Sequence, residues 1–212
     1  MSPKSIIKEI RTYSSNDALV KEKRNHIAKC AVRVFLKKGF HGTSIRDLAE
    51  ECSMTQGALY NYFGSKEDIL HLIAARRVDP DLNDFFSKLG NVNRTQALRK
   101  CMKYYFDVCN EVAASAICFN REINYFSHED RQAILQEQVN IQRFFEQLIR
   151  EGLKSGEFKT DSPELVAFNI LIVGFDWGSR QWFLRKLFTL HEYTEKQTQF
   201  VLDAISTNKT GT

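Results

Sequence analysis

Residues 24–71, RNHIAKCAVRVFLKKGFHGTSIRDLAEECSMTQGALYNYFGSKEDILH, contain a regular succession of helix start and stop signals. Apolar residues first recur at the spacing of one buried helical stripe, at Ile27, Ala31, Val34 and Phe35. Gly39 then supplies the left-handed conformation at which helices commonly end. The pattern predicts an amphipathic helix over residues 17–38, preceded by an N-terminal arm over residues 1–16.

Two short helices separated by a turn are predicted next. Thr43 or Ser44 can cap the first of them, and Asp47 stands three residues after Ser44, as in a capping box. Residues 52–54 form the turn, and Thr55 caps the helix that follows it. Such a pair of helices presents the second one to the major groove of DNA.

The second of these helices begins with groups suited to DNA. The Thr55 hydroxyl and the free backbone N–H groups at the helix start suit a phosphate oxygen. The amide of Gln56 can bind an adenine in bidentate fashion, and Gly57 lets the backbone approach closely. Tyr60 lies one turn from Gln56 on the same face, where its hydroxyl can reach a phosphate.

Three further side chains extend this predicted surface. Asn61 and Tyr62 project at the end of the same helix, and Lys66 places a point charge at the start of the next one. Phosphate contacts of this kind govern the salt dependence of binding, whereas base contacts govern the sequence preference. Each has an ordinary alternative: Tyr60 and Tyr62 as packing aromatics, and Lys66 as a solvated lysine in the first turn of a helix.

The charge of the chain is unevenly divided. Residues 1–77 hold 14 Lys and Arg against 8 Asp and Glu, a net charge of +6, whereas residues 78–212 hold 16 against 18, a net charge of −2. The basic part therefore coincides with the predicted helix-turn-helix, as binding to a polyanion requires. A solvated basic face is the ordinary alternative for the charge taken by itself.

The same residues resemble the DNA-binding domain of TetR-type transcriptional regulators. The matching runs are Phe35-Leu36-Lys37-Lys38-Gly39-Phe40, Thr43-Ser44-Ile45-Arg46-Asp47-Leu48-Ala49, Gly57-Ala58-Leu59-Tyr60-Asn61-Tyr62-Phe63 and Ser65-Lys66-Glu67. The chain departs from the family pattern at Ser53, where the turn normally has glycine. The resemblance adds Thr43 and Arg46 to the predicted DNA contacts, Arg46 as a guanine reader, although Arg46 can instead pair with Glu50.

The resemblance implies an all-α protein with an N-terminal three-helix helix-turn-helix domain over residues 17–77. A C-terminal helical domain for ligand binding and dimerisation is expected over residues 78–212. Strands of alternating polarity are absent from the sequence, and Pro80 begins a polar stretch that predicts a hinge. The further helices are predicted over residues 65–77, 94–112, 116–126, 128–154, 162–187 and 192–206.

A single recognition helix covers few base pairs, so we expect a homodimer that binds a palindromic double-stranded operator. Gly174 and Gly178 stand one turn apart and permit close helix approach, while Trp182 and Phe183 supply apolar area. The predicted dimer interface comprises Phe168, Gly174, Phe175, Gly178, Trp182 and Phe183. An ordinary core within one chain is the alternative.

The middle helices are unusually aromatic and carry polar residues inside apolar stretches. Buried polar groups need partners, which either a ligand cavity or structural hydrogen bonds can supply. The predicted ligand-binding residues are Tyr104, Tyr105, Val108, Phe119, Arg121, Asn124, Tyr125, Phe145, Phe168, Ile172 and Asp176.

The C-terminal half also resembles one branch of the family, the repressors of fatty-acid and other acyl-CoA degradation genes. The resemblance rests on Asn120-Arg121-Glu122, the run from Phe145 to Phe158, and Gly174 through Trp182-Phe183, while Leu184-Arg185-Lys186 departs from the proline-glycine loop of that branch. It implies a repressor that an acyl-CoA effector releases from its operator, with an apolar tunnel for the acyl group and Arg121 near the nucleotide phosphates.

A regulator of an efflux gene that senses aromatic or cationic drugs is the alternative within the family. Such a sensor is expected to place several acidic residues in its pocket. The candidates in this chain are Asp107, Glu111, Glu122 and Asp176. Release by an acyl-CoA or by an aromatic cation distinguishes the two functions.

Other classes of protein fit the residues poorly. The chain has no Gly-rich phosphate loop, no Ser/His/Asp order and no paired metal-ligand motif, so neither an enzyme nor a cofactor or metal site is expected. The five cysteines form no CxxC pair and are expected to be small buried hydrophobes: Cys30, Cys52, Cys101, Cys109 and Cys118. The apolar stretches are too short to span a bilayer and the first residues lack a secretory signal, so we expect a cytoplasmic protein without a membrane partner.

Overall fold

The computed structural model describes residues 17–75, 81–126 and 128–207. In these ranges the regular elements are ten α-helices and one short 3₁₀-helix, and an isolated bridge joins Phe158 to Ser206. The prediction of an all-α protein is therefore confirmed. No helix in the described ranges is long and apolar enough to cross a membrane. The predicted N-terminal arm and the predicted hinge at Pro80 lie outside the described residues.

The helices form two compact units, each with its own core. The first unit comprises residues 1–78 and 114–134, and the second comprises residues 79–113 and 135–212. Two long helices, α6 (Arg94–Arg121) and α7 (His128–Lys154), contribute residues to both units. The predicted boundary near residue 78 did not anticipate that the chain returns to the first unit.

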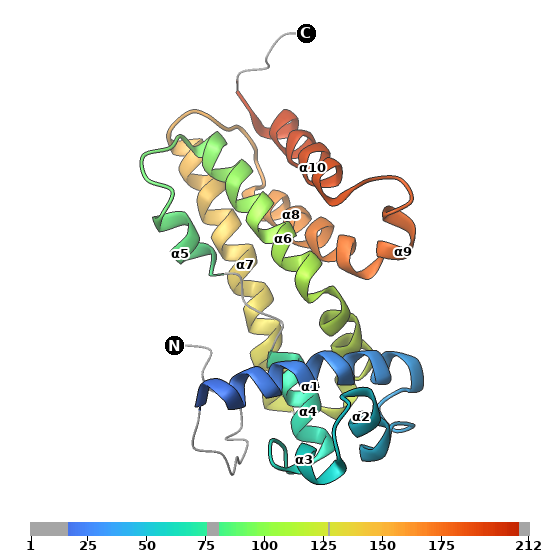
Figure 1. Ribbon diagram of the computed structural model, residues 1–212. Helices are drawn as coiled ribbons and strands as arrows, with labels where there is room; N and C mark the ends of the chain where they lie inside the picture. The colour runs from blue at the N-terminus through green and yellow to red at the C-terminus, as the bar shows by residue number, and fades with distance from the viewer. Residues whose placement is uncertain (1–16, 76–80, 127, 208–212) are drawn as a thin grey trace. The chain divides into compact units, whose positions relative to one another are not determined.

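In the first unit α1 (Asp17–Lys38) packs against α2 (Ile45–Glu51) and α4 (Lys66–Ala75), and α2 packs against α3 (Gln56–Tyr60). Figure 1 shows α1 lying across α4, with α2 next to α3. The apolar stripe of α1 faces this core, since Ile27, Ala31 and Phe35 are fully buried. The bounds of α1 are those that the apolar pattern and Gly39 predicted.

Both predicted helix caps are present. The Asp47 N–H donates to the Ser44 hydroxyl at 3.1 Å and the Ser44 N–H donates to the Asp47 carboxylate at 2.8 Å, which completes a capping box at α2. Lys38 also donates to this carboxylate at 2.5 Å, and together with Ser44 it holds the pKa of Asp47 well below its usual value. At α3 the Thr55 side chain accepts the Ala58 N–H at 3.1 Å.

The turn between α2 and α3 contains Ser53 at φ +54°, the one non-glycine residue of the described ranges with a positive φ. The left-handed conformation costs an L-residue roughly 1–2 kcal/mol. Serine therefore strains the turn that sets the direction of α3. Because the Ser53 side chain is exposed, packing does not explain its presence.

We expect Ser53→Gly to raise the free energy of unfolding by about 0.5–1 kcal/mol, because glycine removes the strain while it increases the entropy of the unfolded chain. Ser53→Val should lower it, because a β-branched residue tolerates this conformation least. Thermal unfolding followed by circular dichroism measures both changes. Equal melting temperatures for the two variants would contradict a strained turn.

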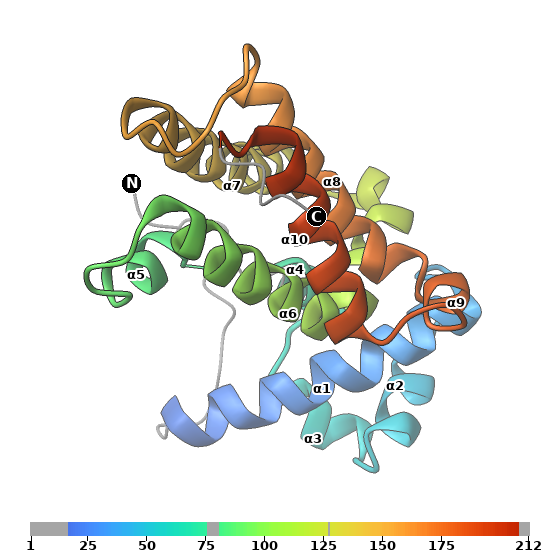
Figure 2. The same cartoon turned by 90° about the horizontal axis from the view of Figure 1, so that it is seen from above.

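The second unit has an apolar core formed by α6, α7, α8 (Pro163–Ser179) and α10 (Leu190–Ile205). The rings of Tyr105 on α6 and Phe145 on α7 lie 5.7 Å apart, and Figure 2 shows α8 and α10 side by side. Two short helices complete the unit, α5 (Leu82–Ser87) and α9 (Gln181–Leu184).

Three predicted boundaries in the C-terminal half are wrong. The helices predicted over 94–112 and 116–126 are the single helix α6, because the alanine-rich stretch between them favours helix, and a 3₁₀-helix at Ile123–Tyr125 follows. The polar stretch after Pro80, where no helix was predicted, contains α5, which Asp81 caps by accepting the Asp84 N–H at 2.9 Å. The helix predicted over 162–187 ends at Ser179, and α9 follows as a separate element.

Candidate functional site

The predicted DNA-reading residues of α3 lie on its exposed face. Thr55, Gln56 and Asn61 are exposed, and Tyr60 is 46% exposed although it is a large aromatic. A methyl group added at Gly57 would meet no atom of the described residues within 4 Å. On the opposite face Leu59 is fully buried in the core of the first unit. The helix is thus anchored by its apolar side and offers its polar side to a ligand.

Two other predicted DNA contacts already have partners within the subunit. Tyr62 is half-buried against the core of the first unit, and its carbonyl accepts from the Arg24 guanidinium at 3.2 Å. Arg46 is exposed on α2 and pairs with Glu50 at 2.9 Å. To contact a guanine edge, Arg46 would therefore have to break this surface ion pair, which contributes little to stability.

Lys66 closes the loop between α1 and α2. Its ammonium donates to the carbonyl oxygen of Phe40 at 2.7 Å and to that of Thr43 at 2.9 Å, and it lies 4.4 Å from the centroid of the Phe40 ring. A phosphate contact by Lys66 would use its remaining donor. The prediction of Thr43 as a DNA contact is wrong for its side chain, which is 2% exposed and donates its hydroxyl to the Gly39 carbonyl at 2.7 Å.

Three of the predicted ligand-binding residues lie together in the first unit. Arg121, Asn124 and Tyr125 line a cavity of about 270 Å³ together with residues 38–42. Arg121 donates to the carbonyl oxygen of Leu36 at 2.8 Å. The Arg121 guanidinium therefore binds a carbonyl oxygen in the last turn of α1, where helical carbonyls lack a partner within the helix. The sequence did not indicate this role.

A buried carboxylate lies beside this cavity. Glu122 is 6% exposed and accepts the backbone N–H of Phe40 at 3.2 Å. The rings of His41 and Tyr125 meet edge to face at 4.4 Å. The residues just after α6 thus hold the loop that joins α1 to α2, and through it the start of the helix-turn-helix.

The structure does not bring the predicted ligand residues of the second unit to one cavity. Tyr105 and Phe145 are buried in the core, where the Tyr105 hydroxyl donates to the Leu171 carbonyl at 2.9 Å. Phe168 and Ile172 are exposed on α8, and Asp176 pairs with Arg180. The two remaining members of this set are half-buried: Tyr104, whose ring stacks on Phe85 at 4.3 Å, and Val108. Phe119 belongs to the core of the first unit.

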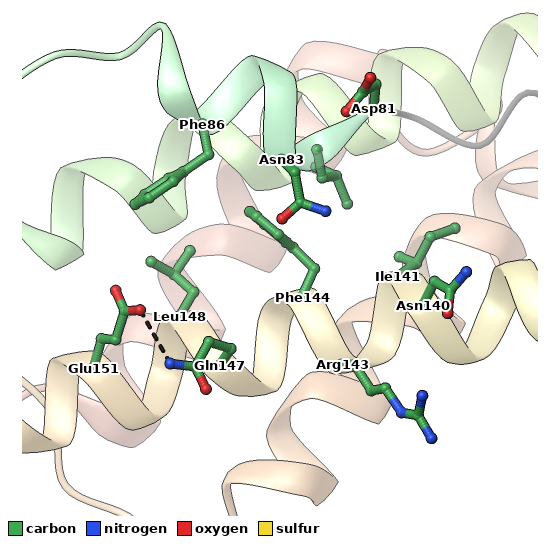
Figure 3. Close-up of a pocket in the computed structure, with 11 residues that line it drawn as sticks. Asp81, Asn83, Phe86, Asn140, Ile141, Arg143, Phe144, Gln147, Leu148 and Glu151 are labelled. Atoms are coloured by element: carbon green, nitrogen blue, oxygen red, sulfur yellow. Dashed lines mark hydrogen bonds between the residues drawn. The ribbon is translucent and has the colours of Figure 1, made fainter. Parts of the chain in front are cut away.

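A groove between α5 and α7 encloses about 410 Å³. Figure 3 shows Phe86 and Asn83 of α5 facing Phe144 and Leu148 of α7, whereas Arg143 extends away from α5. The full lining comprises Asp81, Leu82, Asn83, Phe86, Asn140, Ile141, Arg143, Phe144, Gln147, Leu148 and Glu151. The apolar floor and polar rim suit an amphipathic ligand.

None of the predicted ligand residues lines this groove. It was missed because α5 was not predicted. The signal that could have found it is the pair Asp81 and Asp84, spaced as an N-cap and its third helical residue, followed by the aromatic pair Phe85-Phe86.

The prediction of Gly174 and Gly178 as dimer contacts is wrong, because both face α6 of the same chain. A methyl group at Gly174 would collide with the rings of Tyr105 and Phe106. One at Gly178 would lie 3.2 Å from the Ala113 side chain. The glycines therefore permit the close approach of α8 to α6, and both are buried.

An exposed apolar surface lies on other residues of the second unit, which we call the α8/α10 face. Its members follow one side of α8 and include one aromatic on α10: Leu165, Phe168, Ile172 and Phe200. Phe200 is 73% exposed. Trp182 and Phe183 of α9 are exposed too, while Phe175 is half-buried. Exposed apolar residues along one side of a helix are typical of interaction sites.

Comparison with known proteins agrees with this architecture. A family model described as "Bacterial regulatory proteins, tetR family" matches residues 27–73, and one described as "Tetracyclin repressor-like, C-terminal domain" matches residues 91–186. The HTH-type transcriptional regulator HbdR of Aromatoleum sp. (strain CIB) is 23% identical over 206 residues, which are 97% of this chain and 90% of HbdR.

Two solved structures share the fold at low sequence identity. FadR from Bacillus subtilis in complex with stearoyl-CoA is 19% identical with a TM-score of 0.62, and the match covers 84% of this chain and 97% of FadR. AibR in complex with isovaleryl coenzyme A and operator DNA is 20% identical with a TM-score of 0.64, over 84% of this chain and 97% of AibR. The first family model covers the helix-turn-helix on α2 and α3, and the second covers the helices from α6 to α9. The chain belongs to the TetR family of bacterial transcriptional regulators.

Proposed function

We propose that this regulator is a repressor that binds a palindromic operator as a homodimer and releases it when a small effector binds. The observation that carries the operator binding is the exposed face of α3. Among the described residues no atom lies within 4 Å of a methyl group added at Gly57, and the side chains of Gln56 and Tyr60 are exposed. A helix that reads the groove needs a backbone that can approach the DNA closely, and it needs side chains such as the Gln56 amide and the Tyr60 phenol that can bond to it. The α8/α10 face supports the homodimer, because a two-fold interface needs a self-complementary apolar patch.

The roles of individual residues on α3 can be separated by binding measurements. Gln56→Ala is expected to relax the preference for the operator by about 1–3 kcal/mol, because a bidentate base contact is lost. Tyr60→Phe should weaken binding to every sequence by roughly five-fold, because one phosphate hydrogen bond is lost. Fluorescence anisotropy with the DNA upstream of the gene and with a scrambled duplex measures both. An unchanged operator preference in Gln56→Ala would sink the base-reading role.

We propose the groove between α5 and α7 as the effector site, with an acyl-CoA as the effector. An acyl chain would lie on Phe86, Phe144 and Leu148, and the amides of the rim would meet the polar part. The acyl-CoA class is supported by the ligands named for FadR and AibR. A sensor of cationic drugs is less well supported, because three of the four candidate acids have cationic partners. Asp107 binds Lys103 at 2.8 Å, Glu122 lies 3.7 Å from the Arg121 guanidinium, and Asp176 pairs with Arg180.

The continuous helix α6 offers a route between effector and operator. Its first part belongs to the second unit and its last turns belong to the first, where Arg121 and Glu122 hold the loop between α1 and α2. An effector releases DNA only to the extent that it prefers the form that does not bind DNA.

Asn83→Trp tests the site, because residue 83 is exposed and a large side chain there fills the groove without disturbing the core. We expect unchanged operator affinity and at least about a ten-fold higher acyl-CoA concentration for release. Ser87→Trp, on the same helix outside the groove, is the control and should respond normally. Anisotropy titrations with acyl-CoAs, free acids and aromatic cations give the result. Release by aromatic cations alone would replace the acyl-CoA assignment with drug sensing.

A further inference from the structure

The groove between α5 and α7 has two unlike ends. Near one end Asn83 of α5 faces Phe144 of α7, and its amide has no hydrogen-bond partner among the residues that the structure describes (Figure 3). Glu151 lines the opposite end, seven residues further along α7. An effector in the groove therefore meets an amide that is free to bond at one end and a charged group at the other.

The charged end is closed by an arginine from the start of α6. Nε of Arg94 lies 3.2 Å from Oε2 of Glu151, and the side chains of this ion pair are each 32% exposed. The other oxygen of Glu151 accepts from the Gln147 amide at 3.1 Å (Figure 3). The Arg94 guanidinium also lies over the Phe86 ring, 5.6 Å from its centroid. Arg94 thus contacts both walls of the groove, α5 through Phe86 and α7 through Glu151.

Backbone contacts hold Arg94 and α5 in place. The N–H groups of Arg94 and Thr95 each donate to the Glu157 carboxylate at 3.0 Å, which satisfies donors at the start of α6. On α5 the Phe85 ring stacks on the Tyr104 ring of α6 at 4.3 Å. The closed end of the groove is therefore built on anchored helices, although the ion pair itself lies near the surface.

The walls between the two ends are apolar and of limited length. They are formed by Leu82 and Phe86 of α5 and by Phe144 and Leu148 of α7. From Phe144 to Glu151 the axis of α7 advances roughly 10 Å, at about 1.5 Å per residue. An extended hydrocarbon chain with bonds of about 1.5 Å advances roughly 1.3 Å per carbon, so these walls cover about eight carbons.

We propose that the groove selects its effector by the length of the acyl group, and that the effector is a medium-chain acyl-CoA. The acyl carbonyl oxygen accepts from the Asn83 amide, the chain lies on the apolar walls, and its methyl end reaches the Arg94–Glu151 pair. Arg94 and Glu151 are then specificity-determining residues. The inference rests on the proposed function, because it takes the groove to be the effector site.

The energetic reason for the limit is the change from apolar walls to an ion pair. Each methylene buried on the walls should strengthen binding about three- to four-fold. A methylene placed beside Arg94 and Glu151 instead removes water from two charges without replacing its hydrogen bonds. A longer chain must also push the guanidinium away from the Phe86 ring. Affinity should therefore rise with chain length up to about eight carbons and then stop rising.

Isothermal titration calorimetry of the full chain with butyryl-, octanoyl- and dodecanoyl-CoA tests this limit without operator DNA. Octanoyl-CoA should bind about 10²-fold more tightly than butyryl-CoA, and dodecanoyl-CoA should bind no more tightly than octanoyl-CoA. Arg94→Ser removes the guanidinium and should make dodecanoyl-CoA bind at least about ten-fold more tightly than octanoyl-CoA. Glu151→Ala frees Arg94 from α7 and should change the preference in the same direction.

Arg150→Ser is the matched control, because Arg150 is an arginine of α7 that pairs with Glu146 at 2.8 Å and does not line the groove. It should keep the original length preference. Affinity that continues to rise from octanoyl- to dodecanoyl-CoA in the unsubstituted protein would overturn the limit, and this measurement needs no variant to fold. Folded Arg94→Ser and Glu151→Ala variants with the original preference would overturn the roles of these two residues.

The same titrations separate this inference from the proposed function. If no CoA ester of any length bound, the acyl-CoA effector of the proposed function would fail, and the length limit would fail with it. If the esters bound with equal affinity at every length, the effector class would stand and only the limit would fail. Binding of the free acids alone, with the same rise and stop, would support the limit while removing the CoA ester from the proposed function.

Discussion

Gly152→Ala is expected to lower the free energy of unfolding by about 3 kcal/mol, although alanine is ordinarily the better helix residue. Gly152 lies in α7, and a methyl group there would come closer than 3.0 Å to three ring atoms of Phe158. That ring cannot swing away freely. The Phe158 N–H donates to the Gly152 carbonyl at 3.0 Å, the residue is 2% exposed, and the next N–H, of Lys159, donates to the Ile205 carbonyl at 2.6 Å.

Urea unfolding followed by circular dichroism measures this effect, with Gly57→Ala as the matched control. A methyl group at Gly57 meets no atom within 4 Å, so the same substitution should keep or slightly raise stability there, by up to about 1 kcal/mol. The Gly57→Ala control has a second use. Its methyl group would project from the proposed DNA-reading face of α3, and it should therefore weaken operator binding. Equal free energies of unfolding for Gly152→Ala and Gly57→Ala would show that the Phe158 ring does not exclude a methyl group at residue 152.

The elements that the sequence predicted well are those whose signals are local. The stop at Gly39, the capping box of Ser44 and Asp47, and the cap at Thr55 each act over a few residues, and all three occur in the structure. The whole of α1 and the bounds of α7 also match the apolar period. Local hydrogen bonds and one-sided burial are enough to determine such features.

The features that were mispredicted depend on what a residue packs against. Gly174 was correctly recognised as a site of close helix approach, but the approaching helix is α6 of the same chain. Arg121 bonds the end of α1, 85 positions away in the sequence. Periodicity tells which face of a helix is buried, but it does not name the partner of that face.

Phe200→Glu is expected to convert the protein to monomers and to lower operator affinity by roughly 10²-fold or more, because binding through two linked half-sites is lost. Phe200 is 73% exposed on α10, so the carboxylate enters water in the monomer and should leave the stability of the subunit nearly unchanged. In a two-fold interface each residue occurs twice, and the substitution would therefore place two unpaired charges in one apolar contact.

His191→Glu is the control for this substitution, because residue 191 is also exposed on α10 but lies on the opposite side of the helix by the period of 3.6 residues. Light scattering during size-exclusion chromatography gives the oligomeric state, and anisotropy gives the operator affinity. The two measurements separate assembly from DNA reading.

A monomer with full operator affinity would show that two recognition helices are not needed. A Phe200→Glu dimer with full affinity would place the interface away from the α8/α10 face. Loss of affinity in a dimer would instead assign Phe200 to a contact that positions the DNA-binding units, and only the joint loss of dimer and affinity supports the proposed assembly.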